Sequence, residues 1–161
     1  MASFRKIGEW ERVGRLVNDL GMNIAKSQQM SLMRWGLKAE KIAKEHISHQ
    51  DLGWPALKPA TVTRKISAGY SENILVETST YFQSITSWVS DDTAWCGVKR
   101  GIRTKDGDAE LGLVATVHEF GSNDGTIPAR PLWKPTFEEA MLWHMSKNQP
   151  VMHLANLLAR Y

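Results

Sequence analysis

The first third of the chain carries its apolar side chains at helical spacing. From Ile7 to His49 an apolar residue recurs every three or four positions. This spacing predicts one long amphipathic helix or two helices joined near Gly21 or Gly36. Gly53 and the following Pro55 should end this helix, because neither glycine nor the residue before a proline favours helical backbone. The positions on this face are Trp10, Val13, Val17, Leu20, Ile24, Leu32, Trp35, Ala39, Ile42 and His46.

The pattern changes to alternation in the middle of the chain. Residues 85–90 and 93–98 each alternate as strands do, and Asp91-Asp92 between them form a turn, so this stretch predicts a β-hairpin. The preceding segment, residues 57–67, predicts a loop with room for one helical turn. Residues 99–112 are rich in glycine and charge and predict a long mobile loop or an extended hairpin tip.

Two helix starts are indicated near the C-terminus. Thr136 and Glu139 have the spacing of a capping box, and Pro150 begins a last short helix that extends to Tyr161. Together these elements predict an α+β fold, in which helices from both ends of the chain pack on a small antiparallel sheet. With 161 residues, the chain has the length of a single domain. Its parts are a basic amphipathic helical segment (1–50), a loop and sheet core (51–133) and C-terminal helices (134–161).

Composition narrows the class of protein. Apolar residues make up 42% of the chain and charged residues 23%, which is typical of a folded globular protein. The seven tryptophans exceed what one small core buries with every indole N–H paired, so some are expected at interfaces. The single cysteine, Cys96, lies in a predicted strand as a small core hydrophobe and excludes an intrachain disulfide. We find no secretion signal or membrane span, and we expect a protein made in the cytoplasm without membrane contact.

Positive charge is concentrated in the N-terminal segment. The net charge is +3, and residues 1–50 hold nine Lys or Arg against five Asp or Glu. Such an excess suits contact with nucleic acid or an acidic protein surface, and it suits a solvated helix face equally well. The basic residues are Arg5, Lys6, Arg12, Arg15, Lys26, Arg34, Lys38, Lys41 and Lys44.

Catalytic and zinc motifs are incomplete. His118-Glu119 resembles the start of a zinc-protease helix, but Ser122 stands where a second histidine is required. His46 and His49 lie one helical turn apart, without further ligands at a recognisable spacing. We therefore expect no catalytic residues and no zinc site.

A calcium loop is also incomplete. Asp106, Asp108 and Glu110 have its alternating carboxylates, but Leu111 and Val117 stand where it needs glycine and glutamate. A solvated hairpin tip is favoured. The sequence gives no argument for an enzyme or for a cofactor.

A stiff arm follows this region. Gly121 allows a sharp turn, and Pro128 and Pro131 hold the next residues extended with few free backbone donors. Arg130 and Trp133 then either project as anchors for a protein contact, or belong to an arm that packs on its own sheet with Trp133 in the core. The residues alone leave both readings open.

Four segments, in this order, resemble the tail-completion, or head-to-tail joining, proteins of long-tailed bacteriophages and prophages. Residues 54–65 resemble the family's W-x-x-L-x-x-x-T-x-x-x-K segment, and residues 74–85 its L-x-x-T-G-x-L-x-x-S-I segment, with Ser79 in place of the usual glycine. Residues 117–121 resemble its hEFG turn, and residues 127–135 its iPARPFLrP arm, with Leu-Trp in place of Phe-Leu. The motif residues, which are also candidate interface residues, are Trp54, Thr61, Lys65, His118, Glu119, Phe120, Gly121, Pro128, Ala129, Arg130, Pro131, Trp133 and Pro135.

The resemblance implies a structural virion protein that joins tail to head. It implies a homo-oligomeric ring, a hexamer in this family, that contacts the tail tube or tail terminator and the head connector after assembly in the host cytoplasm. The sheet would form the ring wall, the 99–112 loop would reach a neighbour or the tail tube, and the arm would fix the helix after it.

Two other readings stay open beside this one. In the first, the protein is a small DNA-binding module, whose basic helix also suits packaged DNA in a ring lumen. The residues concerned are Arg12, Arg15, Lys26, Arg34, Lys38 and Lys41. In the second, it is a small hydrolase that uses His118 and Glu119, for which the sequence offers no third polar group.

Overall fold

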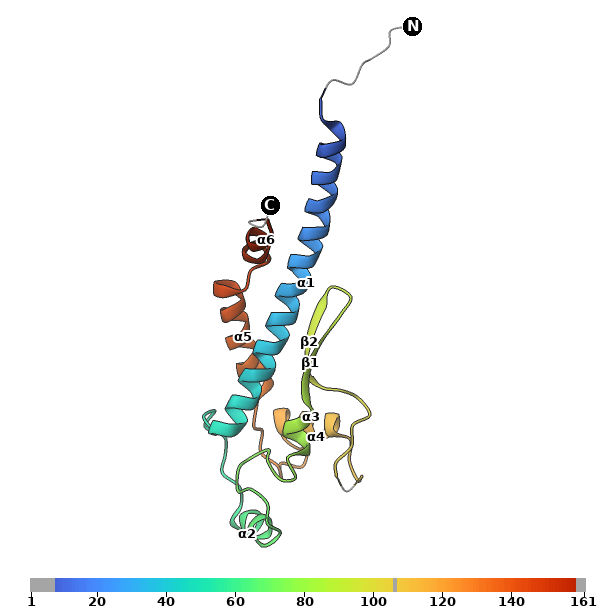
Figure 1. Ribbon diagram of the computed structural model, residues 1–161. Helices are drawn as coiled ribbons and strands as arrows, with labels where there is room; N and C mark the ends of the chain where they lie inside the picture. The colour runs from blue at the N-terminus through green and yellow to red at the C-terminus, as the bar shows by residue number, and fades with distance from the viewer. Residues whose placement is uncertain (1–7, 106, 159–161) are drawn as a thin grey trace.

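Helices dominate the fold, with one hairpin packed among them (Figure 1). The structure is a computed structural model, and it describes residues 8–105 and 107–158. The elements are α1 (Trp10–His49), α2 (Pro59–Ser67), α3 (Thr80–Ser84), β1 (Ile85–Ser90), β2 (Thr93–Val98), α4 (Leu111–Phe120), α5 (Trp133–Lys147) and α6 (Pro150–Leu158). The α+β class predicted from the sequence is confirmed. Within the described residues, no helix is both long and apolar enough to cross a membrane.

The N-terminal segment forms a single helix, which was one of the two predicted forms. α1 has 40 residues, or a length of about 60 Å at 1.5 Å per residue. It ends at Gln50, which adopts a left-handed conformation with φ 54° and donates its N–H to the carbonyl of His46. Figure 1 shows the N-terminal end of α1 extending beyond the other elements, while the hairpin lies along one side of α1 and α5 and α6 lie along another.

The C-terminal half of α1 supplies much of the core. Four of its apolar side chains are at most 1% exposed; two of them, Ala39 and Ile42, lie on the predicted face, and the other two were not predicted. They pack against the hairpin, α3, the start of α4 and the turn before α5. The buried apolar residues of α1 are Ala39, Ile42, Ala43 and Ile47, and those that complete the two clusters are Tyr81, Ile85, Leu111, Leu132 and Ala140.

The predicted hairpin is confirmed. β1 and β2 pair antiparallel through the turn at Asp91 and Asp92, and Trp88 stacks on its cross-strand partner Trp95 at 6.4 Å. A helical glycine lets this hairpin approach α1 closely, because a Cβ on Gly36 would lie 3.1 Å from the Cβ of Ser87. Gly36 therefore serves as a contact point and does not break the helix.

A half-buried carboxylate fixes the hairpin on α1. The Oε2 of Glu40 accepts hydrogen bonds from the backbone N–H and the hydroxyl of Ser87, both at 2.9 Å, and its Oε1 accepts one from Lys44 at 2.7 Å. Burial would raise the pKa of Glu40, but these hydrogen bonds outweigh burial and lower it. The carboxylate is thus held ionised at the seam between helix and strand.

A buried polar link attaches the C-terminal helices to α1. The side-chain amide of Asn148 donates to the carbonyl of Ser31 at 2.7 Å, and the backbone carbonyl of Asn148 accepts from the Ser31 hydroxyl. The Asn148 side-chain oxygen lies 2.8 Å from the Nε2 of His153. All three residues are buried, so the corner between α5 and α6 has a defined position on α1.

Two local predictions were wrong. Residues 57–67, predicted as a loop, contain the nine-residue helix α2. Helix α4 replaces the end of the predicted 99–112 loop and converts the His-Glu-Phe turn into a helix C-terminus. The predicted last helix is described to Leu158, and Tyr161 lies outside the described residues.

Candidate functional site

The motif residues meet at one place, which we call the arm junction. It comprises the 54–56 segment, the last turn of α4 and the arm at residues 127–135. The 54–56 segment bonds to the arm across 74 to 77 residues of sequence, and Glu119 at the end of α4 bonds to the arm across 13 to 15. Side chains of each segment bond to the backbone of another. The junction therefore fixes the entry to α5 by long-range contacts.

Glu119 caps the N-terminus of α5. Its Oε2 accepts hydrogen bonds from the backbone N–H groups of Leu132 at 2.7 Å and Trp133 at 3.0 Å, and its Oε1 accepts from Lys134 at 3.3 Å. The next residue, Pro135, has no N–H, so the free donors of the first helical turn are all accounted for. A carboxylate is also favoured here by the helix dipole.

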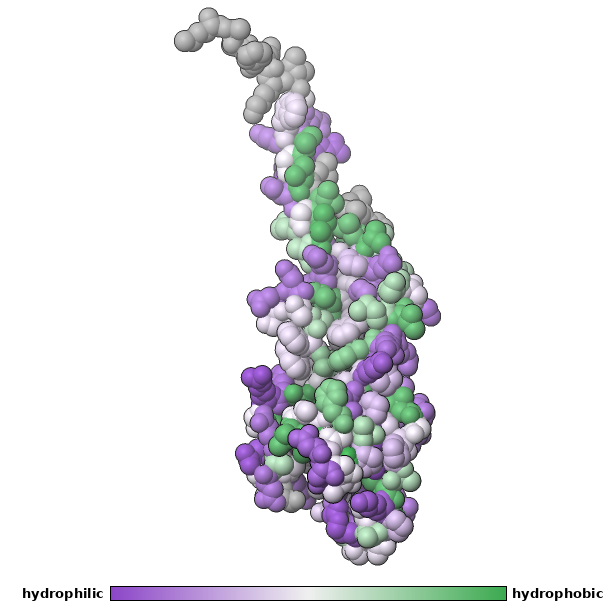
Figure 2. All heavy atoms as spheres, turned by 180° about the vertical axis from the view of Figure 1, so that it is seen from behind, coloured by the Kyte–Doolittle hydropathy of each residue, from purple (hydrophilic) through white to green (hydrophobic). Residues whose placement is uncertain are grey.

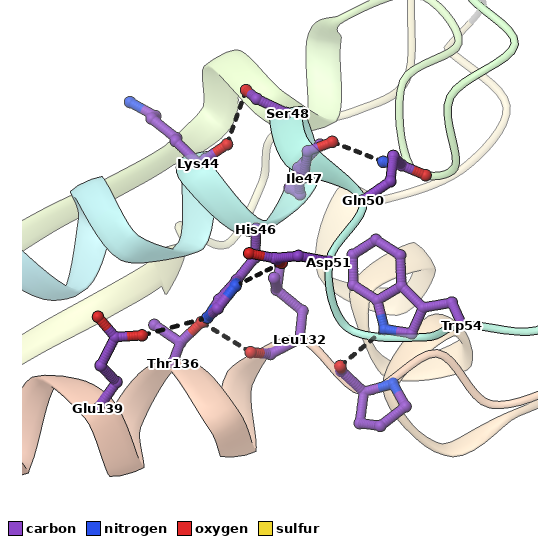
Figure 3. Close-up of polar contacts among 11 residues, drawn as sticks. Lys44, His46, Ile47, Ser48, Gln50, Asp51, Trp54, Leu132, Thr136 and Glu139 are labelled. Atoms are coloured by element: carbon purple, nitrogen blue, oxygen red, sulfur yellow. Dashed lines mark hydrogen bonds and ion pairs between the residues drawn. The ribbon is translucent and has the colours of Figure 1, made fainter.

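The capping box predicted at Thr136 and Glu139 is wrong. Thr136 lies inside the first turn of α5, where its hydroxyl donates to the carbonyl of Leu132 at 2.7 Å. Glu139 is exposed, with its Oε2 3.7 Å from the Nε2 of His46 (Figure 3). The real cap comes from another helix, and no local spacing could have indicated it.

Gly121 shapes the turn that follows α4. Its φ is 83°, and a Cβ there would lie 3.2 Å from both the amide nitrogen of Ala129 and the carbonyl oxygen of Ile127. The predicted sharp turn is therefore confirmed, with close backbone approach as a second reason for glycine.

The loop between Gly121 and the arm has its own hydrogen bonds. The Oδ1 of Asp124 accepts from the Ser122 hydroxyl and from the N–H and hydroxyl of Thr126. These bonds, that of Ser122 first, lower the pKa of Asp124 to about 2. The loop is thus ordered by an acidic side chain that stays ionised over most of the pH range.

Arg130 is buried inside the molecule. Only 4% of it is exposed, and its guanidinium donates to the carbonyls of Pro55 at 3.0 Å and Ala56 at 3.3 Å. Burial lowers its pKa. The reading in which Arg130 projects toward a partner is wrong, because the side chain is buried and bonds to the carbonyls of Pro55 and Ala56.

The remaining arm contacts also point inward. The indole of Trp54 donates to the carbonyl of Pro131 at 2.9 Å (Figure 3), so the arm is attached to this segment in both directions. Trp133 is half-buried and packs on Phe137, with ring centroids 5.8 Å apart. The arm thus packs within its own chain: it bonds to the 54–56 segment, and its Leu132 joins the core cluster that includes Ile85 of β1. Of the other arm motif residues, Pro128 and Pro135 are half-buried, and Ala129 and Pro131 are exposed.

Phe120 is the aromatic residue of the junction that faces outward. It is 78% exposed and is the last residue of α4, directly beside the rigid turn at Gly121. The sequence indicates Phe120 only as part of the hEFG motif. Its exposure follows from the packing of α4, which buries Leu111 at its start and leaves Phe120 at its end open.

The motif residues of α2 have structural contacts. Lys65 is buried and donates to the carbonyl of Asn73 at 2.6 Å, while burial lowers its pKa. Thr61 is half-buried on the same helix. Ser79, at the place of the family's glycine, has φ 59°, a backbone conformation that glycine adopts more easily than serine.

A cavity of about 670 Å³ lies beside the junction, between α2, the 74–78 segment, α4 and the arm. His118 lines it, and its Nδ1 is buried with no hydrogen-bond partner among the described residues. Burial, and then the nearby charge of Arg130, lower the pKa of His118. His118 and Glu119 therefore do not act as a pair, because the Glu119 carboxylate is occupied by the backbone of α5.

The metal candidates are not assembled into a site. His46 bonds to Asp51 at 2.8 Å (Figure 3), and His49 is exposed. In the described ranges, no group of three or more His, Cys, Asp or Glu side chains could hold an ion. Asp106 lies outside these ranges, and the Glu110 of the same segment accepts a hydrogen bond from the N–H of Gly101.

The basic residues of α1 are partly paired within the helix. Ion pairs join Arg12 to Glu9, Lys41 to Glu45 and Lys44 to Glu40. Arg15, Lys26 and Arg34 are exposed, Lys38 is half-buried, and Arg5 and Lys6 lie outside the described residues. The face is therefore mixed in charge, which weakens its attraction for phosphate.

Cys96 behaves as its strand position predicts. Its side chain packs on the second core cluster, and burial raises the pKa of the thiol to about 12. The thiolate needed for nucleophilic chemistry is thus disfavoured.

Comparisons with known proteins return no match: no family model, curated protein or solved structure is significantly similar to this chain.

Proposed function

We propose that this protein is a structural component of a phage virion that completes the tail or neck and joins the tail to the head as an oligomeric ring. The observation that supports this is the arm junction. Three segments that carry the resemblance to joining proteins, at residues 54–65, 117–121 and 127–135, bond to one another through Glu119, Arg130 and Trp54. Residues that form one connected unit are a stronger basis for a family resemblance than short matches that never meet.

In this proposal the junction is a rigid mount for a contact surface. Arg130 and Trp133 hold the arm in place, and Phe120 is the side chain that contacts another virion subunit. A large aromatic residue on a preorganised backbone loses little entropy on docking, which favours it as an anchor.

The test is to delete the gene from its phage or prophage and examine the induced lysate by electron microscopy. We expect filled heads beside separate, full-length tails. Complementation with Phe120→Ala should leave joining defective although the purified variant stays folded. The matched control is Leu113→Ala, which removes another exposed apolar side chain of α4 and should restore intact virions.

Normal virions from the deletion strain would overturn the proposal. If the purified protein then bound duplex DNA with an affinity that falls steeply as salt rises, the DNA-binding alternative would replace it. Arg130→Ala is not a test of contact, since it removes the hydrogen bonds that hold the arm.

A further inference from the structure

The projecting N-terminal part of α1 bears an apolar stripe that the other described residues leave open. We define the stripe as Val13, Val17, Leu20 and Ile24, which are between 42% and 62% exposed. Figure 2 shows apolar side chains running along this part of the molecule. At 100° per residue the four side chains share one face, while the charged Glu11, Arg12, Arg15 and Asp19 lie on the opposite half of the helix.

The same face is covered by a helix further along α1. The three-and-four spacing of the stripe continues to Ser27 and Ser31, and these two are at most 2% exposed. There the chain's own C-terminal helices lie against α1 and run antiparallel to it (Figure 1), with Asn148 bonded to Ser31. The stripe begins where the described part of the C-terminal helices ends. A helix that covered the stripe would therefore continue the antiparallel packing that these helices make on α1.

Two glycines on the flank of the stripe indicate close approach. Gly14 and Gly21 are seven residues apart on one side of the helix, and a Cβ on either would meet nothing within 4 Å. An exposed glycine inside a helix lowers its stability relative to alanine, so nothing within the described residues explains the pair. Gly36 shows the purpose of such a residue in this same helix, because there another element comes within contact distance of the backbone.

We propose that this face binds α1 of a second copy of the chain, in an antiparallel pair. In that arrangement Val17 lies beside Leu20 of the other copy, and Val13 beside Ile24. In an antiparallel pair, the side of the helix that carries the glycines lies on the same side of the contact in both copies. Gly14 therefore faces Gly21 of the other copy, and the two backbones come close. In a parallel pair the glycine flanks fall on opposite sides.

The shape of the molecule also favours this arrangement. The bulk of each copy surrounds α1 beyond Ser27, so a parallel pair would bring the two bodies together at one end, whereas an antiparallel pair places them at opposite ends (Figure 1). A twofold contact joins two copies and cannot add a third. The ring of the proposed function would therefore use other surfaces. The pair does not depend on that function and is measured on the purified chain.

The first experiment is sedimentation velocity on the full chain from about 1 to about 100 μM. We expect association that Val17→Glu weakens by at least about tenfold, because a charge enters the apolar seam. The pair Gly14→Gln and Gly21→Gln should weaken it similarly, although glutamine favours helix more than glycine does. The matched control, Leu142→Glu, changes an equally exposed apolar side chain on α5 and should leave association unchanged. Far-UV circular dichroism checks that all variants stay helical.

The second experiment measures orientation. A spin label on Met33→Cys, in a Cys96→Ala background, should give a distance of about 45 Å between copies in the antiparallel pair and less than about 25 Å in a parallel one. A short distance overturns the proposal. So does a wild-type chain that stays monomeric over the whole range, which would assign the stripe to a different partner, or an oligomer that persists in both stripe variants.

Discussion

The two halves of α1 have the same apolar spacing, but one lies in the core and the other is exposed. In the C-terminal half, Ile42 and Ile47 are at most 1% exposed, whereas in the N-terminal half Val17 is 62% exposed. Their glycines differ in the same way, since Gly36 touches the hairpin and Gly21 touches nothing. Spacing therefore indicates which face of a helix is to be covered, and the tertiary structure decides what covers it.

The largest expected difference between the halves is in the free energy of unfolding. Ile47→Ala should lower it by about 3 kcal/mol, because the substitution leaves a cavity in the main core. Val17→Ala should change it by less than about 0.5 kcal/mol, because this side chain contributes no core contact in the monomer. Urea denaturation at low protein concentration measures both. Equal losses in the two variants would contradict the comparison.

The arm junction resembles the C-terminal half of α1, because its contacts also lie within the chain. Glu119→Ala should lower the free energy of unfolding by about 2 kcal/mol, since three backbone N–H groups at the start of α5 lose a charged acceptor. Glu138→Ala, at an exposed position of the same helix, is the control and should have little effect. A near-neutral Glu119→Ala would mean that water replaces the cap.

Replacing glycine by alanine should change the free energy of unfolding in opposite directions in the two halves of α1. Gly36→Ala should lower the free energy of unfolding by about 1 kcal/mol, because the new Cβ would lie 3.1 Å from Ser87, which Glu40 holds in place. Gly21→Ala should raise it by about 1 kcal/mol in the dilute monomer, where only helix propensity changes. Thermal denaturation of the two variants measures these shifts. If both substitutions changed the free energy of unfolding in the same direction, close approach of the hairpin would not explain Gly36.

The smallest expected effect concerns pH. His118 has a folded-state pKa below its ordinary value of 6.5, so the unfolded chain takes up a proton there before the folded one does. The free energy of unfolding should therefore fall as pH drops below about 6.5. His118→Leu should make this fall shallower, and His153, whose pKa burial also lowers, should account for part of what remains. Urea denaturation at a series of pH values measures the slope, and an unchanged slope would show that His118 is not involved.

Helix α4 shows why some elements could not be predicted. Its sequence, LGLVATVHEF, is apolar on nearly every side, so neither helical nor alternating spacing stands out. The long helix α1 and the hairpin were predictable because each keeps one period over many residues. α2 is short and begins at a proline, where loop and helix start look alike.

The sequence by itself determined the class of fold, the helical period of α1, the hairpin and the sharp turn at Gly121, because each depends on local spacing or on the conformational range of one residue. Only the tertiary structure decided that Glu119 caps α5, that Arg130 is buried and that Phe120 is exposed. The first two outcomes depend on carbonyl and N–H groups that lie 13 to 75 residues away in the chain. A hydrogen bond between remote segments leaves no spacing in the sequence, since folding alone brings its two partners together.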